Sequence, residues 1–200
     1  MGKLSKPTLE LIAAFDSSVS ANVVCHYRCA HQLQACFHFL RDQELPFAAL
    51  NIYRGAMETA LKGLWWILFA KDFESDVSAR ESLAISSLNS IAKLVDEAIM
   101  PGGTAFWTLL NSTDTFLGLQ LLNDVLHPSA HGHALVSGLV AFASGTSQPR
   151  IEVQLSEAFD QVMQLFTAVF KKHGGTITQN ESTEFALVLE FPELPWKAVK

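Results

Sequence analysis

The chain has 200 residues, 49% of them hydrophobic and 17% charged, a balance that suits a folded domain with one substantial core. Its formal net charge of -6 provides no broad basic surface that would release counterions from a nucleic acid, so a nucleic-acid partner is not expected by default. The densest apolar run, residues 64–70, is far shorter than the roughly 20 residues that cross a bilayer. The first seven residues also lack the apolar stretch of a secretory signal. We therefore expect no membrane association and a cytoplasmic location.

The first predicted helical region covers residues 8–43, as one long helix or as a short helix followed by a long one. Residues 16–18 provide a cap or a break near its start. Three cysteines fall on one stripe of this region, and we expect them to be buried, reduced and packed as small hydrophobic residues. Zinc binding by these thiolates is an alternative without the paired Cys-x-x-Cys pattern that would favour it. The cysteines are Cys25, Cys29 and Cys36, and the histidines of the same region, expected on a partly exposed face, are His26, His31 and His38.

A second helix is predicted from Pro46, which suits a first helical turn, to about Lys71. Its apolar residues recur at core-facing spacing, yet Arg54 lies within that stripe and Glu58 follows one turn later. A charge among core residues must be paired or solvated, because burying it alone is very costly. Two interpretations stay open: an ion pair within the helix at the edge of the core, or a polar pocket between helices that both side chains face.

Further helices are predicted over residues 76–99, 104–126 and 153–172, with a short one within 129–143. Asp76 or Ser78 is the expected cap of 76–99, and Ser78 and Glu81 have the spacing of a capping box. The Pro-Gly-Gly sequence at 101–103 ends that helix. The expected fold is therefore an all-α antiparallel bundle of four long helices and one or two shorter ones. Residues 1–173 form its single domain.

Residues 174–200 follow the predicted helices of the bundle and are expected to form a C-terminal tail. Within 185–191, Phe185, Leu187, Leu189 and Phe191 alternate with other residues, which is the spacing of a strand. No partner strand is evident, so the tail should lie across the bundle, pair with itself, or pair with another subunit. The last arrangement would make a homodimer.

Residues 122–133 hold the strongest chemical signal, with three histidines, a carboxylate and an amide around Pro128. Three interpretations compete: a divalent metal site such as zinc, a catalytic site with His127 as general base, and a turn that His127 caps. The catalytic interpretation uses Asp124 or Glu58 to orient His127. Pro128 disfavours helical geometry at the preceding residue, so the later histidines cannot be placed by counting turns. The metal ligands would be Asp124, His127, His131 and His133.

Two segments resemble uncharacterised bacterial helical families related to the HEPN superfamily (higher eukaryote and prokaryote nucleotide-binding domains). They are residues 51–58, with Arg54-x-x-x-Glu58 followed by Trp65, and residues 122–127, with Asn123 before His127. The resemblance implies a helical bundle, often dimeric, in which the arginine, glutamate, asparagine and histidine converge. Ribonucleases of the superfamily use an arginine and a histidine separated by four to six residues, and here no arginine stands among residues 120–126.

These patterns favour an HEPN-like helical protein that binds a ligand or belongs to a stress or defence module. The expected site is a polar pocket for a small anionic ligand, with no cofactor, lined by Arg54, Glu58, Asn123, Asp124 and His127. One alternative is an enzyme centred on His127, either ribonuclease-like or a metal-dependent hydrolase. Another is a structural or interaction protein that dimerises through its tail.

Overall fold

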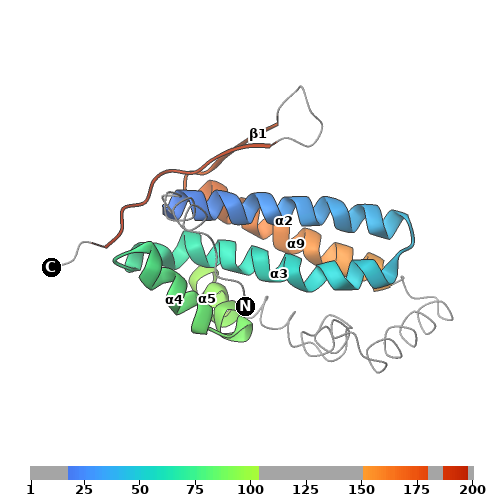
Figure 1. Cartoon of the computed structure of the whole chain (residues 1–200), viewed down its shortest axis with the longest axis horizontal. Coiled ribbons are helices and arrows are strands. Elements are labelled where there is room, and N and C mark those ends of the chain that lie inside the picture. The colour runs from blue at the N-terminus through green and yellow to red at the C-terminus, as the bar shows by residue number, and fades with distance from the viewer. Residues whose placement is uncertain (1–17, 104–150, 180–186, 198–200) are drawn as a thin grey trace, which may run out of the picture.

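The structure is a computed structural model, and it describes residues 18–103, 151–179 and 187–197. Three long helices lie side by side, with two shorter helices across one end and a two-stranded sheet near the C-terminus (Figure 1). The predicted all-α fold class is confirmed, including the strand-like tail. The helices predicted over 104–126 and within 129–143 lie outside the described residues, as do residues 8–17.

Helix α2 spans Val19–Asp42 and helix α3 spans Pro46–Phe69, and the tight turn between them makes the two antiparallel. Ser18 caps α2 by accepting a hydrogen bond from the amide of Ala21 at 3.0 Å, which fulfils the predicted cap at residues 16–18. Pro46 occupies the first turn of α3 as predicted, where its missing amide hydrogen costs nothing. A single 3-10 turn, Ala70–Asp72, continues α3 and carries Lys71.

The helix predicted over 76–99 is two helices, which corrects the single-helix prediction. Helix α4 spans Asp76–Ile85 and helix α5 spans Leu88–Ile99, with an extended backbone at Ser86 between them. The Ser87 side chain accepts a hydrogen bond from the amide of Ser90, so it starts α5 as an N-cap. Adjacent serines favour such a break because their hydroxyls compete with the helical hydrogen bonds of the backbone.

The capping box at the start of α4 is also one turn earlier than predicted. Ser75, and not Ser78, is the N-cap, and its hydroxyl oxygen accepts from the Ser78 amide at 3.3 Å. The Ser78 hydroxyl in turn accepts from the Ser75 amide at 3.2 Å. Two amides that a helix leaves without partners are thereby satisfied.

We expect Ser75→Ala to lower the free energy of unfolding by about 1 kcal/mol, since it removes the side-chain oxygen that caps α4. Urea denaturation followed by circular dichroism measures the change. The matched control is Ser75→Asp, which keeps an acceptor at the same place and should stay near wild type. Equal stabilities of the two variants would contradict the capping role.

Helix α9 spans Ile151–Lys172 and packs against both α2 and α3. It runs parallel to α3, so the C-terminal ends of these two helices lie at the same end of the bundle (Figure 1). Gly174 ends α9 with a φ of 91°, a left-handed conformation that suits glycine, and the amide of Gly175 donates to the Phe170 carbonyl at 2.9 Å.

The tail pairs with itself, which is one of the three predicted arrangements. Strand β1, Thr176–Gln179, is antiparallel to strand β2, Leu187–Glu190, in the register that places Ile177 opposite Leu189. The chain after β2 then lies on the bundle. The carbonyl of Phe191 accepts from the Ser20 hydroxyl at 2.7 Å, and the Trp196 ring stacks edge-on against Trp66 at 6.3 Å between centroids.

The core lies between α2, α3 and α9 and is rich in aromatic rings. Tyr27 of α2 meets Phe166 and Phe170 of α9 at 5.0 and 4.9 Å between ring centroids. Trp65 and Trp66 of α3 are buried beside the tail and α4. The core residues of α2 are Val19, Val23, Tyr27, Ala30 and Phe37.

The three cysteines are free and exposed, so the prediction that they are buried is wrong. The buried face of α2 carries Val23, Tyr27, Ala30 and Phe37, and at about 100° per residue the cysteine stripe falls on the other side of the helix. The burial frequency of cysteine misled the prediction, because α2 has a whole face that no other described element covers.

Among the described helices, none combines the length and apolar composition that spanning a membrane requires.

Candidate functional site

The structure places Arg54 and Glu58 one turn apart on α3, both half-buried. Glu58 bonds Lys62 one turn further on, with 2.5 Å between the lysine nitrogen and a carboxylate oxygen. Side-chain exposures of 36% for Glu58 and 33% for Lys62 describe an ion pair at the rim of the core. Such intrahelical pairs contribute a few tenths of a kcal/mol. The carboxylate of Glu58 is therefore engaged with a lysine that the sequence interpretation did not include.

The remaining predicted site residues, Asn123, Asp124, His127, His131 and His133, lie outside the described residues. Their convergence with Arg54, and the metal, catalytic and capping interpretations of His127, stay predictions. In the described ranges, no group of three or more histidine, cysteine or acidic side chains is arranged to hold a metal ion.

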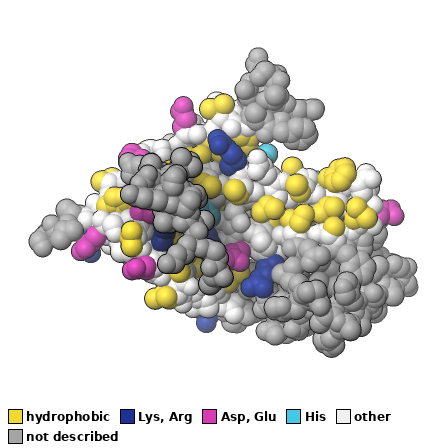
Figure 2. Space-filling model, in the orientation of Figure 1, with side chains coloured by type: hydrophobic (Ala, Val, Ile, Leu, Met, Phe, Trp, Pro, Cys, Tyr) yellow, Lys and Arg dark blue, Asp and Glu magenta, His cyan; other side chains and the backbone are white. Residues whose placement is uncertain are grey.

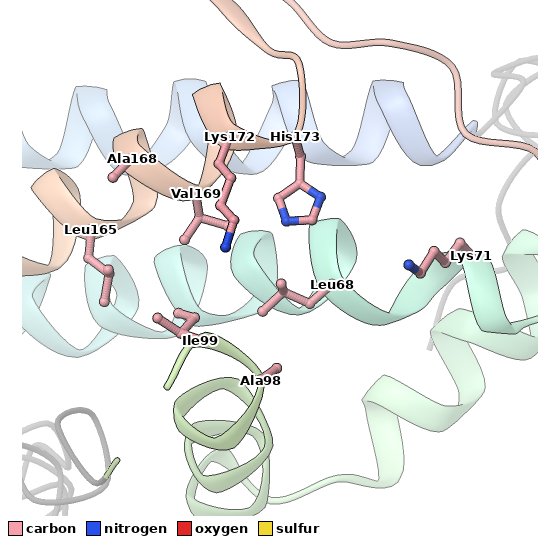
Figure 3. A pocket seen from close by; sticks show the side chains of 9 residues that line it. All are labelled: Leu68, Lys71, Ala98, Ile99, Leu165, Ala168, Val169, Lys172 and His173. Carbon is pink, nitrogen blue, oxygen red and sulfur yellow. The ribbon is translucent and has the colours of Figure 1, made fainter. Parts of the chain in front are cut away.

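The described residues form a different candidate site, a cavity of about 480 Å³ between α3, α5 and α9. Figure 3 shows its position where the C-terminal ends of α3 and α9 meet the last turn of α5. Six aliphatic side chains form most of the wall, and three basic side chains stand at one end. The lining residues are Leu68, Lys71, Ala98, Ile99, Leu165, Ala168, Val169, Lys172 and His173.

The basic side chains reach the cavity from two elements. Lys172 and His173 extend from the end of α9, and Lys71 extends toward His173 from the turn after α3 (Figure 3). Among the described residues of the lining, none is a carboxylate. Within the described residues, neither lysine forms an ion pair. The site is thus locally positive in a protein whose net charge is -6.

The pKa of His173 lies below its ordinary value of 6.5. Partial desolvation is the main cause, and the positive charges of Lys172 and then Lys71 add to it. The two lysines therefore act on the imidazole through space, which indicates a positive potential at this end of the cavity. A bound anion would offset that potential and favour protonation of His173.

A second polar cluster lies on the other side of α3. His26, Lys62 and Arg80 line a smaller cavity of about 250 Å³, and the guanidinium of Arg80 lies 5.9 Å from the centre of the Trp66 ring. Its cations already have partners, because Lys62 bonds Glu58 and Arg80 bonds Asp76 at 2.7 Å. The pKa of His26 lies below its ordinary value, chiefly because the imidazole is buried. This cluster links α2, α3 and α4. Because its lysine and arginine already form ion pairs, it offers a ligand less unpaired positive charge than the first cavity.

The sequence interpretation missed Lys71, Lys172 and His173 because each looks like an ordinary end of a helix. Basic residues favour the last turn, where they complement the negative end of the helix dipole. The available signal was that two helices, predicted over 46–71 and 153–172, both end in lysine. Only the parallel packing of α3 and α9 brings those ends together.

Comparison of the chain with family models, with curated proteins and with solved structures finds no match. The HEPN resemblance therefore stays a hypothesis.

Proposed function

We propose that the protein binds a small amphipathic anion, a carboxylate or similar group on an apolar body, in the cavity between α3, α5 and α9. The observation that carries this proposal is the asymmetry of the lining, with aliphatic side chains over most of the wall and three nitrogen groups at one end. Ligand pockets of a few hundred Å³ that join an apolar wall to a few convergent polar groups are the usual form of a small-molecule site.

The charges of the site favour an anion over a neutral or cationic ligand. Among the described residues of the lining, Lys71 and Lys172 have no carboxylate partner, so an anionic group would receive charge-assisted hydrogen bonds without displacing a described pair. The aliphatic wall, with Leu68, Ile99 and Leu165, would cover the apolar body and gain the free energy of its removal from water. This proposal keeps the small anionic ligand that the sequence suggested, at a different site.

Octanoate is a suitable probe, and isothermal titration calorimetry is the measurement. We expect wild type to bind octanoate, and binding to weaken by about tenfold for each of Lys71→Gln and Lys172→Gln, since each removes one charge-assisted hydrogen bond. Octanol tests the aliphatic wall without a charged group, and acetate tests the basic end without a long apolar chain. Both should bind much more weakly than octanoate.

The matched control is Lys197→Gln, which removes an exposed lysine that is not part of the lining. It should bind octanoate like wild type. Equal loss of affinity in this control would show a general effect of net charge, and no octanoate binding by wild type would overturn the proposed ligand class.

Octanoate affinity should also rise as the pH falls through the titration of His173, whose pKa lies below its ordinary value of 6.5 in the free protein. The pKa of His173 is lowered in the free protein, and a carboxylate beside it raises that pKa, so binding takes up a proton. The affinity for octanoate begins to rise when the pH falls below the raised pKa of His173 in the complex. It stops rising once the pH is below the pKa of His173 in the free protein. Titrations across this range with His173→Gln should show a flatter dependence, and an unchanged slope would exclude His173 from the site.

The enzyme hypotheses need a separate test, since His127 lies outside the described residues. An RNA-degradation assay that compares wild type with His127→Ala addresses the ribonuclease hypothesis. Equal behaviour of the two proteins would end it without affecting the proposed ligand cavity.

A further inference from the structure

The outer face of α2 is exposed over its whole length and carries little charge. We define this face as the exposed residues between Ala21 and Asp42. Figure 2 shows hydrophobic side chains in a row along this helix. Phe39 is 61% exposed. The uncharged residues of the face include Cys25, Cys29, Gln32, Ala35, Cys36 and Phe39.

The spacing of these residues is that of a helix-packing surface. Cys25, Cys29, Gln32, Cys36 and Phe39 recur at alternating intervals of four and three, the pattern that makes a continuous stripe for a second helix. The opposite face of α2 already packs on α3 and α9. An exposed stripe that joins an aromatic ring to small, uncharged side chains is the kind of surface on which proteins associate.

The two exposed charged residues of this face are complementary to those of a second copy of α2. Arg28 and Asp42 are its exposed charged residues, they have opposite signs, and they lie at opposite ends with Ala35 midway between them at a spacing of seven. Asp42 accepts a hydrogen bond from its neighbour Arg41 at 2.9 Å through one carboxylate oxygen, and its side chain is 62% exposed, so it stays accessible to a partner. Residues seven apart lie along the same edge of a helix. A second α2 packed antiparallel about a two-fold axis at Ala35 would therefore bring Arg28 beside Asp42 of the partner subunit, and this contact would occur twice.

We propose that two copies of this chain associate through the outer face of α2 in this antiparallel arrangement. The small side chain of Ala35 allows the two helices to approach closely at the two-fold axis. Phe39 of each copy packs on the exposed stripe of the other α2 helix. A parallel arrangement would place Arg28 beside Arg28 and Asp42 beside Asp42, so repulsion between like charges disfavours it. The contact is separate from the ligand cavity, which α3, α5 and α9 form.

The cysteines report on the orientation. Cys36 follows Ala35, so the antiparallel arrangement brings the two Cys36 thiols near the axis and near each other. Cys29 would lie opposite position 41 of the partner helix and Cys25 opposite position 45, past the end of that helix, so neither meets a cysteine close enough for a disulfide. A parallel pair would instead place Cys25 beside Cys25.

Oxidation with diamide distinguishes these arrangements. Two thiols give up two protons and two electrons to one diamide, which becomes the corresponding hydrazine, and a disulfide forms. The variant Cys25→Ser/Cys29→Ser, which retains Cys36 alone, should form a disulfide-linked dimer on a non-reducing gel. Cys36→Ser should remain a single chain. A disulfide-linked dimer of Cys36→Ser would overturn the antiparallel arrangement, because a parallel pair aligns Cys25 with Cys25 as well as Cys36 with Cys36.

Sedimentation equilibrium under reducing conditions tests the interface itself. We expect a dimer whose dissociation constant rises about tenfold in Arg28→Glu and in Asp42→Lys, because each breaks both symmetric contacts, and the double variant should recover most of the loss. Glu157→Lys, at an exposed position of α9, is the matched charge control and should leave the dimer unchanged. All three positions are exposed, so circular dichroism should show unaltered folding.

A monomer at every concentration that can be reached would overturn the proposal. A dimer that Arg28→Glu and Phe39→Glu both leave intact would also overturn it, because the association would then use another surface, such as the tail.

Discussion

Phe166→Ala should lower the free energy of unfolding by about 3–5 kcal/mol, the usual loss when a large buried ring is truncated in a core. The Phe166 ring is fully buried in α9 and meets Tyr27 of α2 edge-on, with 5.0 Å between centroids and 64° between planes. It also lies against Gly63 of α3, so it is the side chain at which all three long helices meet. Truncation would leave a cavity that no single helix can close without moving away from two others.

Urea unfolding followed by circular dichroism provides the measurement. Ile85→Ala is the control, because that side chain is 88% exposed at the end of α4 and its truncation should change stability by no more than about 0.5 kcal/mol. A loss below about 1 kcal/mol in Phe166→Ala would show that the three helices do not pack as described.

Gly63→Ala and Gly55→Ala should change stability in opposite directions, although both replace a glycine within α3. A Cβ atom at Gly63 would lie 2.7 Å from Cε1 of Phe166 and 2.9 Å from Cβ of His26, closer than such atoms approach. The helices would have to separate, and we expect a loss of about 1–3 kcal/mol despite the better helix propensity of alanine. At Gly55 the same atom meets nothing within 4 Å, so the propensity gain of about 0.5–1 kcal/mol should appear as added stability.

The same denaturation measurement compares the two alanine variants. Phe166→Leu offers a further check, since its shorter side chain should reduce the additional loss caused by Gly63→Ala. A Gly63→Ala variant as stable as wild type would contradict the close approach of α2, α3 and α9 at Gly63, and a destabilised Gly55→Ala would contradict the open space at Gly55.

The helical class and most helix boundaries follow from the sequence, because they depend on local chemistry. Pro46 and Gly174 set the start of α3 and the end of α9 through backbone preferences that act within a few residues. The division of residues 76–99 was missed, since Leu88, Ile91 and Val95 continue the apolar spacing while serine capping at Ser87 interrupts the helix. Periodicity alone could not detect a break that leaves the spacing almost intact.

The ligand cavity and the exposed cysteines were decided by tertiary packing. Lys71 and Lys172 are 101 positions apart in the sequence numbering, and only the parallel orientation of α3 and α9 joins their helix ends around one cavity. Similarly, Cys36 is as apolar as its buried neighbour Phe37, so composition could not show which face of α2 the bundle covers. The sequence by itself determines where helices form, because hydrogen bonds and side-chain spacing within a helix are local. The relative direction of those helices decides which side chains meet and which stay exposed, because it depends on packing between distant segments.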